Sequence, residues 1–414
     1  MKILFLVTED WYFWSHRVRL AQAARSAGAE ILIMTHVGQL RAAMEEAGFR
    51  VVPWNISRHS LNPFRELNAL FQVVRAYQRE RPDLLHHVAL KPIVYGGFAA
   101  RLCGGIGSIN AVAGLGHVFT SSLWSMRLLR TVLFKLLRAA LNGKNAESVF
   151  ENEDNRSLLV QKGIVSRGQS VVIRGNGINT EEFSPQPEPA GIPVVMLASR
   201  MLWEKGVGEF VTAARMLRGQ GLLARFVLVG RPDPENPSSI PDEQLRRWQD
   251  SGLVEYWGYR DGMAAVLAQS NVVCLPSYLE GLPRVLIEAA ACGRAIVTTD
   301  VPGCREVVRH NDNGLLVPPR DSDALAAALA NLIKNPHLRS TMGARGRHVA
   351  VREFSEETVF PQFMAIYRDV LGSQRSGTFQ LMHGEDQIAS ESCVHDKTAH
   401  NEGDSELQQG SSPF

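Results

Sequence analysis

Long apolar runs are missing from this chain of 414 residues. No stretch of about eighteen apolar residues occurs without a charge, so no segment is predicted to cross a bilayer as a helix. The apolar run that follows Lys2 ends at Glu9, which is too short for the core of a secretory signal, and no small-residue cleavage site follows it. We therefore expect a cytoplasmic protein that does not span a membrane.

Cysteine is scarce, and neither sign of charge is in excess. The five cysteines show no Cys-x-x-Cys spacing, so free thiols in a reducing compartment are expected, with neither disulfides nor a zinc site. They are Cys103, Cys274, Cys292, Cys304 and Cys393. With 44 Lys and Arg against 42 Asp and Glu, the net charge of +2 creates no field that would gather nucleic acid. We expect an enzyme without metal, cofactor or nucleic-acid partner.

Two successive series of strands and helices are present in the pattern. Short β-branched apolar runs alternate with amphipathic stretches as far as residue 334, a rhythm typical of parallel sheets covered by helices. The series restarts after residues 183–193, whose dense prolines predict a stiff linker. We predict an α/β protein with two tandem Rossmann-like, doubly wound parallel-sheet domains, residues 1–182 and 194–354, and a cleft between them.

The end of the chain divides into two parts. Residues 355–371 carry helical periodicity, whereas residues 372–414 are polar and show no sustained apolar period. We predict a terminal helix followed by a disordered tail.

A polar turn follows the buried strand predicted over Asn271–Leu275. Pro283 suits the first turn of a helix, so the free N–H groups of the turn Glu280–Pro283 are expected at the positive end of a helix dipole, where phosphate binds. Glu288 lies one to two turns into that helix within an apolar run, and the two hydroxyls of a ribose could satisfy its carboxylate. Glu280 is placed to meet a ligand in the cleft. Taken singly, either glutamate could be an ordinary surface or helix-start acid.

Two cations occupy a second loop of the same kind. Arg200 and Lys205 follow the strand predicted over Val194–Ala198 and precede an amphipathic helix. At the carboxyl edge of a parallel sheet they could clamp a diphosphate, Arg200 through its planar fork and Lys205 as a point charge. Alone they could equally be solvated charges. Opposite the turn at Gly281, they complete a nucleotide-diphosphate site.

These residues in this order resemble the family-4 retaining glycosyltransferases of the GT-B fold, over about residues 1–371. The resemblance implies transfer of a sugar from a nucleotide-diphosphate sugar, with catalytic roles for Glu280, Arg200 and Lys205. Glu280 would touch the donor sugar, the two cations the diphosphate, and Glu288 the ribose. The donor-binding residues it implies are Arg200, Lys205, Gly281, Leu282, Pro283 and Glu288. It also implies that the terminal helix packs on the first domain.

The first half matches this family less well. Relatives have a Gly-Gly loop where this chain has Thr8–His16, and a cleft histidine where our alignment places Ala113, close to His117. The stretches Phe13–His16, His86–Pro92 and Gly114–Gly116 resemble enzymes that build bacterial lipid-linked or surface oligosaccharides. Acceptor-side candidates are His16, His86, His87, Lys91 and His117. Part of this set could be structural.

The segment 123–141 is the other distinctive feature. On a helix, Arg127, Arg130, Lys135 and Arg138 would gather on one side and leucines would occupy much of the rest. Such a helix can lie on anionic lipid at the inner face of the membrane, or it can be a core helix with a basic outer face.

The predicted reaction is retaining, metal-independent transfer of a hexosyl or N-acetylhexosaminyl group to a glycan or polyprenyl-linked acceptor. A sugar-nucleotide epimerase of the same fold and a noncatalytic nucleotide-binding scaffold remain the alternatives.

Overall fold

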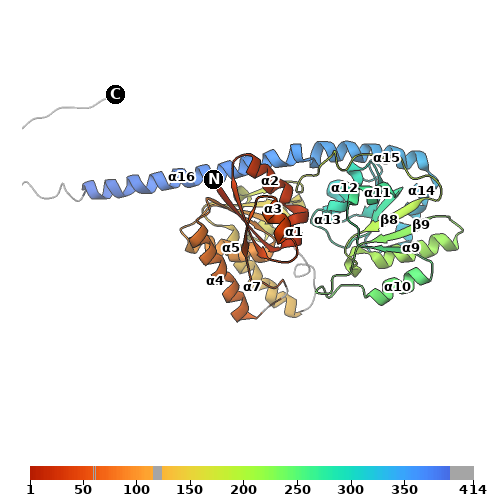
Figure 1. Cartoon of the computed structure of the whole chain (residues 1–414), viewed down its shortest axis with the longest axis horizontal. Coiled ribbons are helices and arrows are strands. Elements are labelled where there is room, and N and C mark those ends of the chain that lie inside the picture. Colours follow the sequence, from red (N-terminus) through yellow and green to blue (C-terminus); the bar gives the residue numbers. More distant parts are fainter. Residues whose placement is uncertain (59, 61, 115–123, 392–414) are drawn as a thin grey trace, which may run out of the picture. The chain divides into compact units, whose positions relative to one another are not determined.

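A computed structural model gives the structure of the chain (Figure 1). It describes residues 1–414 except 59, 61, 115–123 and 392–414, and the side chains of 124–129 and 374–391 are also outside the description. Residues 1–371 form one compact unit. That unit contains two parallel sheets covered by helices, which confirms the predicted fold class.

The first sheet has seven parallel strands in the order β3-β2-β1-β4-β5-β6-β7. Its strands are β1 Lys2–Glu9, β2 Glu30–His36, β3 Arg50–Pro53, β4 Leu84–Val88, β5 Ser108–Val112, β6 Ala146–Phe150 and β7 Ser170–Val172. In the centre, Ile3 lies opposite Ile31 on one side and Leu84 on the other. Helices cover both faces, so the central strands are continuous apolar runs.

In the described part of the first domain there are eight helical segments. They are α1 Asp10–His16, α2 Val18–Ser26, α3 Arg41–Glu46, α4 Pro63–Glu80, α5 Leu90–Leu102, α7 Trp124–Leu141, α8 Glu153–Gln161 and the short η1 Arg167–Gln169. Helices α4, α5 and α7 pack on one face of the sheet, whereas α1 and α2 pack on the other.

The first helix begins earlier than the sequence predicts. The helical period of the sequence predicts one helix over Ser15–Ala27, but two short helices meet at Arg17. The Asp10 carboxylate accepts the backbone N–H groups of Trp11 at 2.7 Å and Gly38 at 2.8 Å, which fastens the start of α1 directly after β1. The loop expected after the first strand is therefore a helix that begins at the sheet edge.

The second sheet has six parallel strands in the order β10-β9-β8-β11-β12-β13. They are β8 Val194–Ala198, β9 Arg225–Val229, β10 Glu255–Gly258, β11 Val272–Leu275, β12 Ala295–Thr299 and β13 Leu315–Val317. Its helical segments are η2 Trp203–Lys205, α9 Val207–Gly219, α10 Asp242–Asp250, α11 Met263–Ala268, α12 Arg284–Ala291, α13 Pro302–Val307, α14 Ser322–Lys334, α15 Pro336–Val349 and η3 Ala350–Phe354. Both sheets reverse their strand order next to the first strand, where open α/β sheets bind ligands.

The last helix, α16 Glu356–Glu391, returns to the first domain (Figure 1). Val359, Phe363 and Tyr367 are buried in the core of the first sheet. The helix continues past Leu371, where the sequence prediction ended it, so residues 372–391 are helical and the rest of the expected tail lies outside the described residues. The lack of an apolar period in residues 372–391 indicates that they are not buried, but it does not exclude a helix. No proline interrupts them.

Two further features of the structure concern the membrane and the cysteines. In the part of the chain that the structure describes, no helix is both long and apolar enough to cross a membrane. Cys103, Cys274, Cys292 and Cys304 are free thiols, and Cys393 lies outside the described residues.

Candidate active site

A large cavity lies between the carboxyl edges of the two sheets. Its volume is about 1210 Å³. The first domain supplies the ends of β1, β5 and β6 together with α1, and the second supplies the loops after β8, β9 and β11. Of the residues predicted from sequence, it is lined by Arg200, Lys205, Glu280, Gly281, Leu282, Pro283, Glu288 and His16.

The loop after β8 places Lys205 against the loop after β11. Gly206 has φ +73°, and a Cβ there would lie 2.1 Å from the Pro276 carbonyl oxygen, so only glycine permits this approach. The Lys205 Nζ lies 2.5 Å from Glu280 Oε1, which also accepts the Ser277 hydroxyl at 2.6 Å. The cation and the acid predicted from separate motifs therefore form one ion pair at the cavity wall.

Arg200 shares a carboxylate with an arginine of the first domain. Asp233 Oδ2 accepts from Arg200 at 2.7 Å and from Arg58 at 2.8 Å. Burial alone would raise the pKa of Asp233, but these hydrogen bonds hold it below its ordinary value. The Arg200 side chain is still partly exposed at the cavity, so it can also meet an anion there. Sequence reasoning did not find Asp233, because nothing local marks a partner 33 residues away.

Glu288 is buried on α12, as the apolar run around it predicts. Its Oε1 accepts from Arg284 Nε at 2.7 Å, one helical turn earlier. Burial raises the pKa of Glu288, and the Arg284 charge offsets part of the rise. The carboxylate lines the cavity within the second domain, next to the turn at Gly281.

The turn at Gly281 is also where the two domains touch. Its carbonyl oxygen accepts from Asn152 Nδ2 at 2.6 Å, and Asn152 Oδ1 caps α8 by accepting the Asn155 N–H at 2.8 Å. A Cβ at position 281 would lie 2.2 Å from the Ala113 carbonyl oxygen. The turn at Gly281 is thus held against the ends of β5 and β6 with no room for a side chain.

Glu151, directly after β6, is a site residue that sequence reasoning missed. Burial raises its pKa to about 7, the Arg17 charge opposes the rise, and Glu280 adds to it. Arg17 Nη2 is 3.9 Å from Glu151 Oε1, which is close enough for attraction but too long for a hydrogen bond. A carboxyl group with a pKa near neutral therefore lines the cavity together with Lys205 and Glu280.

Glu151→Gln should raise stability at alkaline pH. A folded-state pKa near 7 exceeds the ordinary 4.5, so the folded protein loses stability as pH rises through this window and remains less stable above it. Glutamine cannot ionise, and the gain at pH 8 should reach at most about 3 kcal/mol and shrink toward pH 5. Urea unfolding at pH 8 and pH 5 measures the difference in free energy of unfolding between variant and wild type, with the exposed Glu45→Gln as control. A gain that does not depend on pH would contradict the prediction.

Helix α1 lines the first-domain side of the cavity with aromatic rings. Trp11, Tyr12 and Trp14 all face it, and the rings of Trp11 and Tyr12 meet edge to face at 5.8 Å. Such surfaces are typical of pockets for organic ligands. The sequence prediction gave these rings no place at the cavity.

His16 lies at the end of this wall. Its ring stacks on Tyr12 at 4.2 Å, and Nδ1 lies 2.6 Å from the Ser15 hydroxyl oxygen. Burial and the charges of Arg284 and Arg17 lower its pKa to about 3. The imidazole is therefore neutral at physiological pH and can hydrogen-bond an uncharged hydroxyl.

Two family models match the chain, one on each domain. The model described as "Glycosyl transferase 4-like" matches residues 2–146, and the model described as "Glycosyl transferases group 1" matches residues 192–335. Together they span more than half of the chain. The chain belongs to the GT-B glycosyltransferases. The second match contains Arg200, Lys205, Glu280 and Glu288, the residues on which the predicted resemblance depends.

Characterised transferases are similar along most of the chain. Over 384 residues this transferase is 28% identical to N,N'-diacetylbacillosaminyl-diphospho-undecaprenol alpha-1,3-N-acetylgalactosaminyltransferase of Campylobacter jejuni, covering 90% of this chain and 99% of that protein. The capsular polysaccharide biosynthesis glycosyltransferase CapM of Staphylococcus aureus is 21% identical over 74% of this chain and 82% of that protein.

Solved structures share the fold. Sucrose-phosphate synthase of Thermosynechococcus elongatus superposes with a TM-score of 0.74 at 22% identity, covering 90% of this chain and all of that one. HepE of Anabaena, crystallised with UDP and glucose, superposes with a TM-score of 0.71 at 21% identity, covering 89% and 99%.

Two predicted acceptor-side histidines of the transferase are core residues instead. His86 stacks on Phe5 at 4.8 Å and its Nδ1 lies 2.6 Å from the hydroxyl of Tyr367 on α16. His87 points to the other face of the sheet, with ring nitrogens 2.9 Å from the Tyr77 hydroxyl and 2.8 Å from Asn110 Oδ1. Burial lowers the pKa of both, so both are neutral. The expectation that one of them faces the cleft is wrong, because both precede the end of β4.

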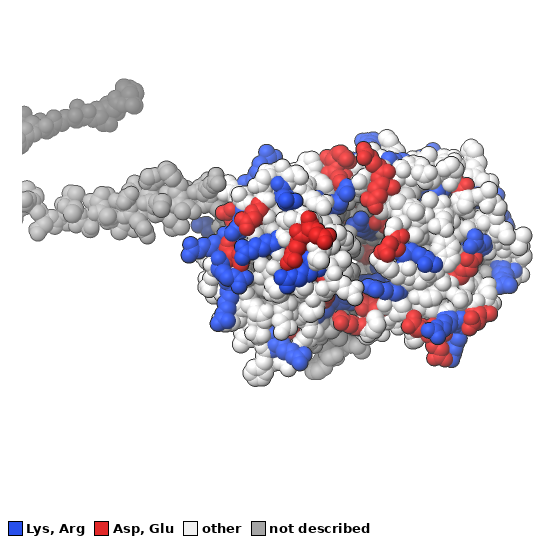
Figure 2. All heavy atoms as spheres, viewed as in Figure 1, with Lys and Arg blue, Asp and Glu red and all other residues white. Residues whose placement is uncertain are grey.

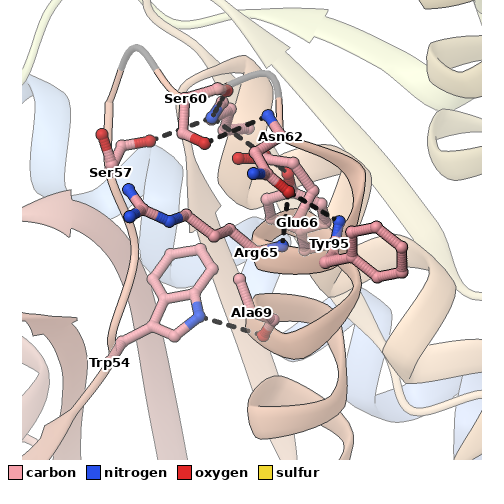
Figure 3. Close-up of polar contacts among 10 residues, drawn as sticks. Trp54, Ser57, Ser60, Asn62, Arg65, Glu66, Ala69 and Tyr95 are labelled. Atoms are coloured by element: carbon pink, nitrogen blue, oxygen red, sulfur yellow. Dashed lines mark hydrogen bonds and ion pairs between the residues drawn. The ribbon is translucent and has the colours of Figure 1, made fainter.

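Lys91 is also turned away from the cavity. Its Nζ donates to the carbonyl oxygens of Ser57 and Ser60 and to Glu66 Oε2, at 2.8–2.9 Å. Tyr95 donates to the same carboxylate oxygen (Figure 3). Burial would raise the pKa of Glu66, but these donors lower it. Lys91 therefore fastens the loop before α4 and is not an acceptor ligand.

His117, the remaining acceptor-side candidate, lies outside the described residues.

Proposed function

We propose that this transferase moves a sugar from a nucleotide-diphosphate sugar to an acceptor hydroxyl with retention of anomeric configuration. The observation that supports this most is the convergence of Arg200, Lys205 and Glu288 on one cavity beside the turn at Gly281. Arg200, Lys205 and the start of α12 favour binding of a diphosphate. The buried Glu288 carboxylate favours binding of two adjacent hydroxyl groups. The UDP with which HepE was crystallised is consistent with such a donor.

In this proposal the second domain stabilises the leaving group. The diphosphate lies between the β8 loop and the start of α12, and Lys205 exchanges part of its pairing with Glu280 for the phosphate oxygens. Arg200 and Lys205 then balance the charge that develops as the bond from the anomeric carbon to the phosphate oxygen breaks. Glu280 stays beside the donor sugar, and Glu288 accepts from both ribose hydroxyls.

The acceptor side of the proposed reaction belongs to the first domain. The acceptor hydroxyl enters from the wall of α1 and attacks the anomeric carbon on the face that the diphosphate leaves. Its proton passes to the departing phosphate oxygen, so the scheme uses neither a metal ion nor a cofactor. Neutral His16 orients the hydroxyl. Among the described residues, no group of three or more His, Cys, Asp or Glu side chains is arranged to hold a metal ion.

We propose a lipid-linked or surface glycan as the acceptor, with the enzyme at the cytoplasmic face of a membrane. Support comes from the undecaprenol-linked and capsular names of the relatives. Helix α7 supports a place at the membrane only in part, because Leu137 of the expected apolar face is buried in the core. Val132, Leu136, Lys135 and Arg138 stay exposed.

Nucleotide binding tests the donor half of this proposal. A thermal-shift panel of UDP, GDP, ADP and their sugars should single out one base, because a tight ligand raises the unfolding temperature by mass action. The product's anomeric configuration, read by NMR, tests retention. Epimer formation without any acceptor would favour an epimerase, and binding without turnover on any acceptor would favour a scaffold.

Glu288→Gln should weaken binding of the preferred nucleoside diphosphate at least about tenfold, because an amide has one acceptor oxygen where the carboxylate has two. The wild type should also bind the 2′-deoxy nucleotide more weakly than the ribonucleotide, and the variant should lose that preference. Calorimetric titration measures both effects, with the exposed Glu243→Gln as the matched control. Equal preference for the ribonucleotide in variant and wild type would contradict the ribose assignment.

A further inference from the structure

Helix α4 presents an unusual outer face. Its inner face is buried in the first domain's core through Ala69, Val73, Ala76 and Tyr77. On the opposite face Phe64, Leu67 and Phe71, which we call the α4 stripe, are 83%, 65% and 51% exposed. Their spacing of three and four residues aligns them on one side of the helix. Single exposed apolar residues are ordinary, but three large ones in a row mark a contact surface.

Positive charge flanks the α4 stripe. Arg65 and Arg75 are both exposed on α4, and the Arg75 guanidinium lies 4.3 Å from the centre of the Phe71 ring. Figure 2 shows Lys and Arg side chains gathered along the outer edge of the first domain, where Figure 1 places α4.

The two acids of α4 do not offset this charge, since both are paired on the inner side. Glu66 binds Lys91 and Tyr95 (Figure 3). Glu80 is buried, and its carboxylate lies 3.0 Å from Arg50 and 2.7 Å from Arg79. The whole of α4 is described, and its exposed ionisable side chains are arginines only.

Hydrogen bonds fix the position of the helix that carries the α4 stripe. Asn62 Oδ1 caps the helix by accepting the N–H groups of Phe64 at 3.0 Å and Arg65 at 3.4 Å. Trp54 Nε1 donates to the Ala69 carbonyl oxygen at 3.1 Å (Figure 3). Helix α7 covers the same face of the sheet, with α5 between them, and it exposes Val132 and Leu136 beside Lys135.

We propose that the outer face of α4, with the α4 stripe inserted among the headgroups and Arg65 and Arg75 on lipid phosphates, docks the enzyme on an anionic membrane surface. Apolar rings flanked by arginines match the boundary between acyl chains and negative headgroups. A second copy of this face would bring arginines against arginines, which disfavours self-association. The inference rests on the proposed place of the reaction at a membrane, and it assigns the main contact to α4, with α7 beside it.

Vesicle binding of the full chain tests this face without using the reaction. Vesicles of phosphatidylcholine alone, and of phosphatidylcholine mixed with phosphatidylglycerol, are sedimented with protein at low salt. The wild type should partition onto the anionic vesicles. The triple variant Phe64→Gln, Leu67→Gln, Phe71→Gln should lose at least about tenfold in partition coefficient. Arg65→Gln with Arg75→Gln should lose about tenfold on anionic vesicles only.

Matched controls come from the second domain. Leu223, 74% exposed, gives the control Leu223→Gln, and Arg215→Gln with Arg246→Gln removes two exposed charges; neither should change partition. Thermal shifts with nucleotide show that each variant is folded. Three results would overturn the docking face: no binding of the wild type to anionic vesicles, unchanged binding of the triple variant, or a solution dimer that this variant converts to monomer. Vesicle binding without nucleotide binding would instead refute the proposed function alone.

Discussion

Lys205→Ala should lower turnover by at least about a hundredfold, and Arg200→Ala should have an effect of the same order. In the proposed reaction each variant removes a cation from the position where the departing diphosphate develops charge, and the loss of a single such group typically costs a factor of about 10²–10³. Turnover is measured as nucleoside diphosphate released in the presence of acceptor. The fold should persist, because the contacts of both side chains lie at the cavity wall rather than in the core.

Control variants show whether the effect comes from the two cavity cations or from any loss of positive charge. Lys144→Ala and Arg215→Ala remove exposed cations outside the cavity and should leave turnover unchanged. Lys205→Arg keeps the charge but changes its geometry, so it should recover part of the loss. Near-normal rates in Lys205→Ala and Arg200→Ala together would refute the clamp. Asp233→Asn frees Arg200 from its shared carboxylate and shows whether that pairing limits donor binding.

Gly281→Ala should lower kcat by about a hundredfold while nucleotide binding changes far less. A methyl group at this position would lie 2.2 Å from the Ala113 carbonyl oxygen, so the turn and the first domain must move apart by about 1 Å. A misplacement of this size can cost about 10²-fold in rate. In the proposed function the diphosphate ligands belong to the second domain alone, which is why binding should survive.

Gly219→Ala is the matched control, since a methyl group there meets no atom within 4 Å. Steady-state kinetics and calorimetric titration with nucleoside diphosphate provide the two readouts. If Gly281→Ala weakened nucleotide binding as much as turnover, the glycine would serve the phosphate directly and not the approach of the domains.

The placement of the predicted donor-side residues at one cavity could be predicted because its determinants are local. Arg200, Lys205, Glu280 and Glu288 each lie within a strand-loop-helix unit, and parallel strands bring the loops after their carboxyl ends to one edge. The Lys205–Glu280 ion pair joins residues 75 positions apart, yet both loops were predictable. What could not be predicted is that the two groups neutralise each other before a ligand arrives.

The acceptor half depended on long-range packing and was predicted poorly. His86 is covered by Tyr367, 281 residues later in the chain, and no local pattern announces that contact. Glu151 acquires its raised pKa from burial where the two domains meet, which again has no local signal. Lys91 and the α4 stripe show the same limit, since their roles depend on which side of a helix a neighbouring loop covers.

The α/β fold with two parallel sheets, and the loops that carry Arg200, Lys205 and Glu280, follow from the amino-acid sequence, because hydrophobic period and strand-loop-helix order are short-range properties. Which polar groups face the cavity and which lie in the core depends on the tertiary structure. It also decided which apolar side chains of α4 and α7 remain uncovered. Burial and domain contact arise between residues far apart in the chain, and they alone determine the solvation and charge of each side chain.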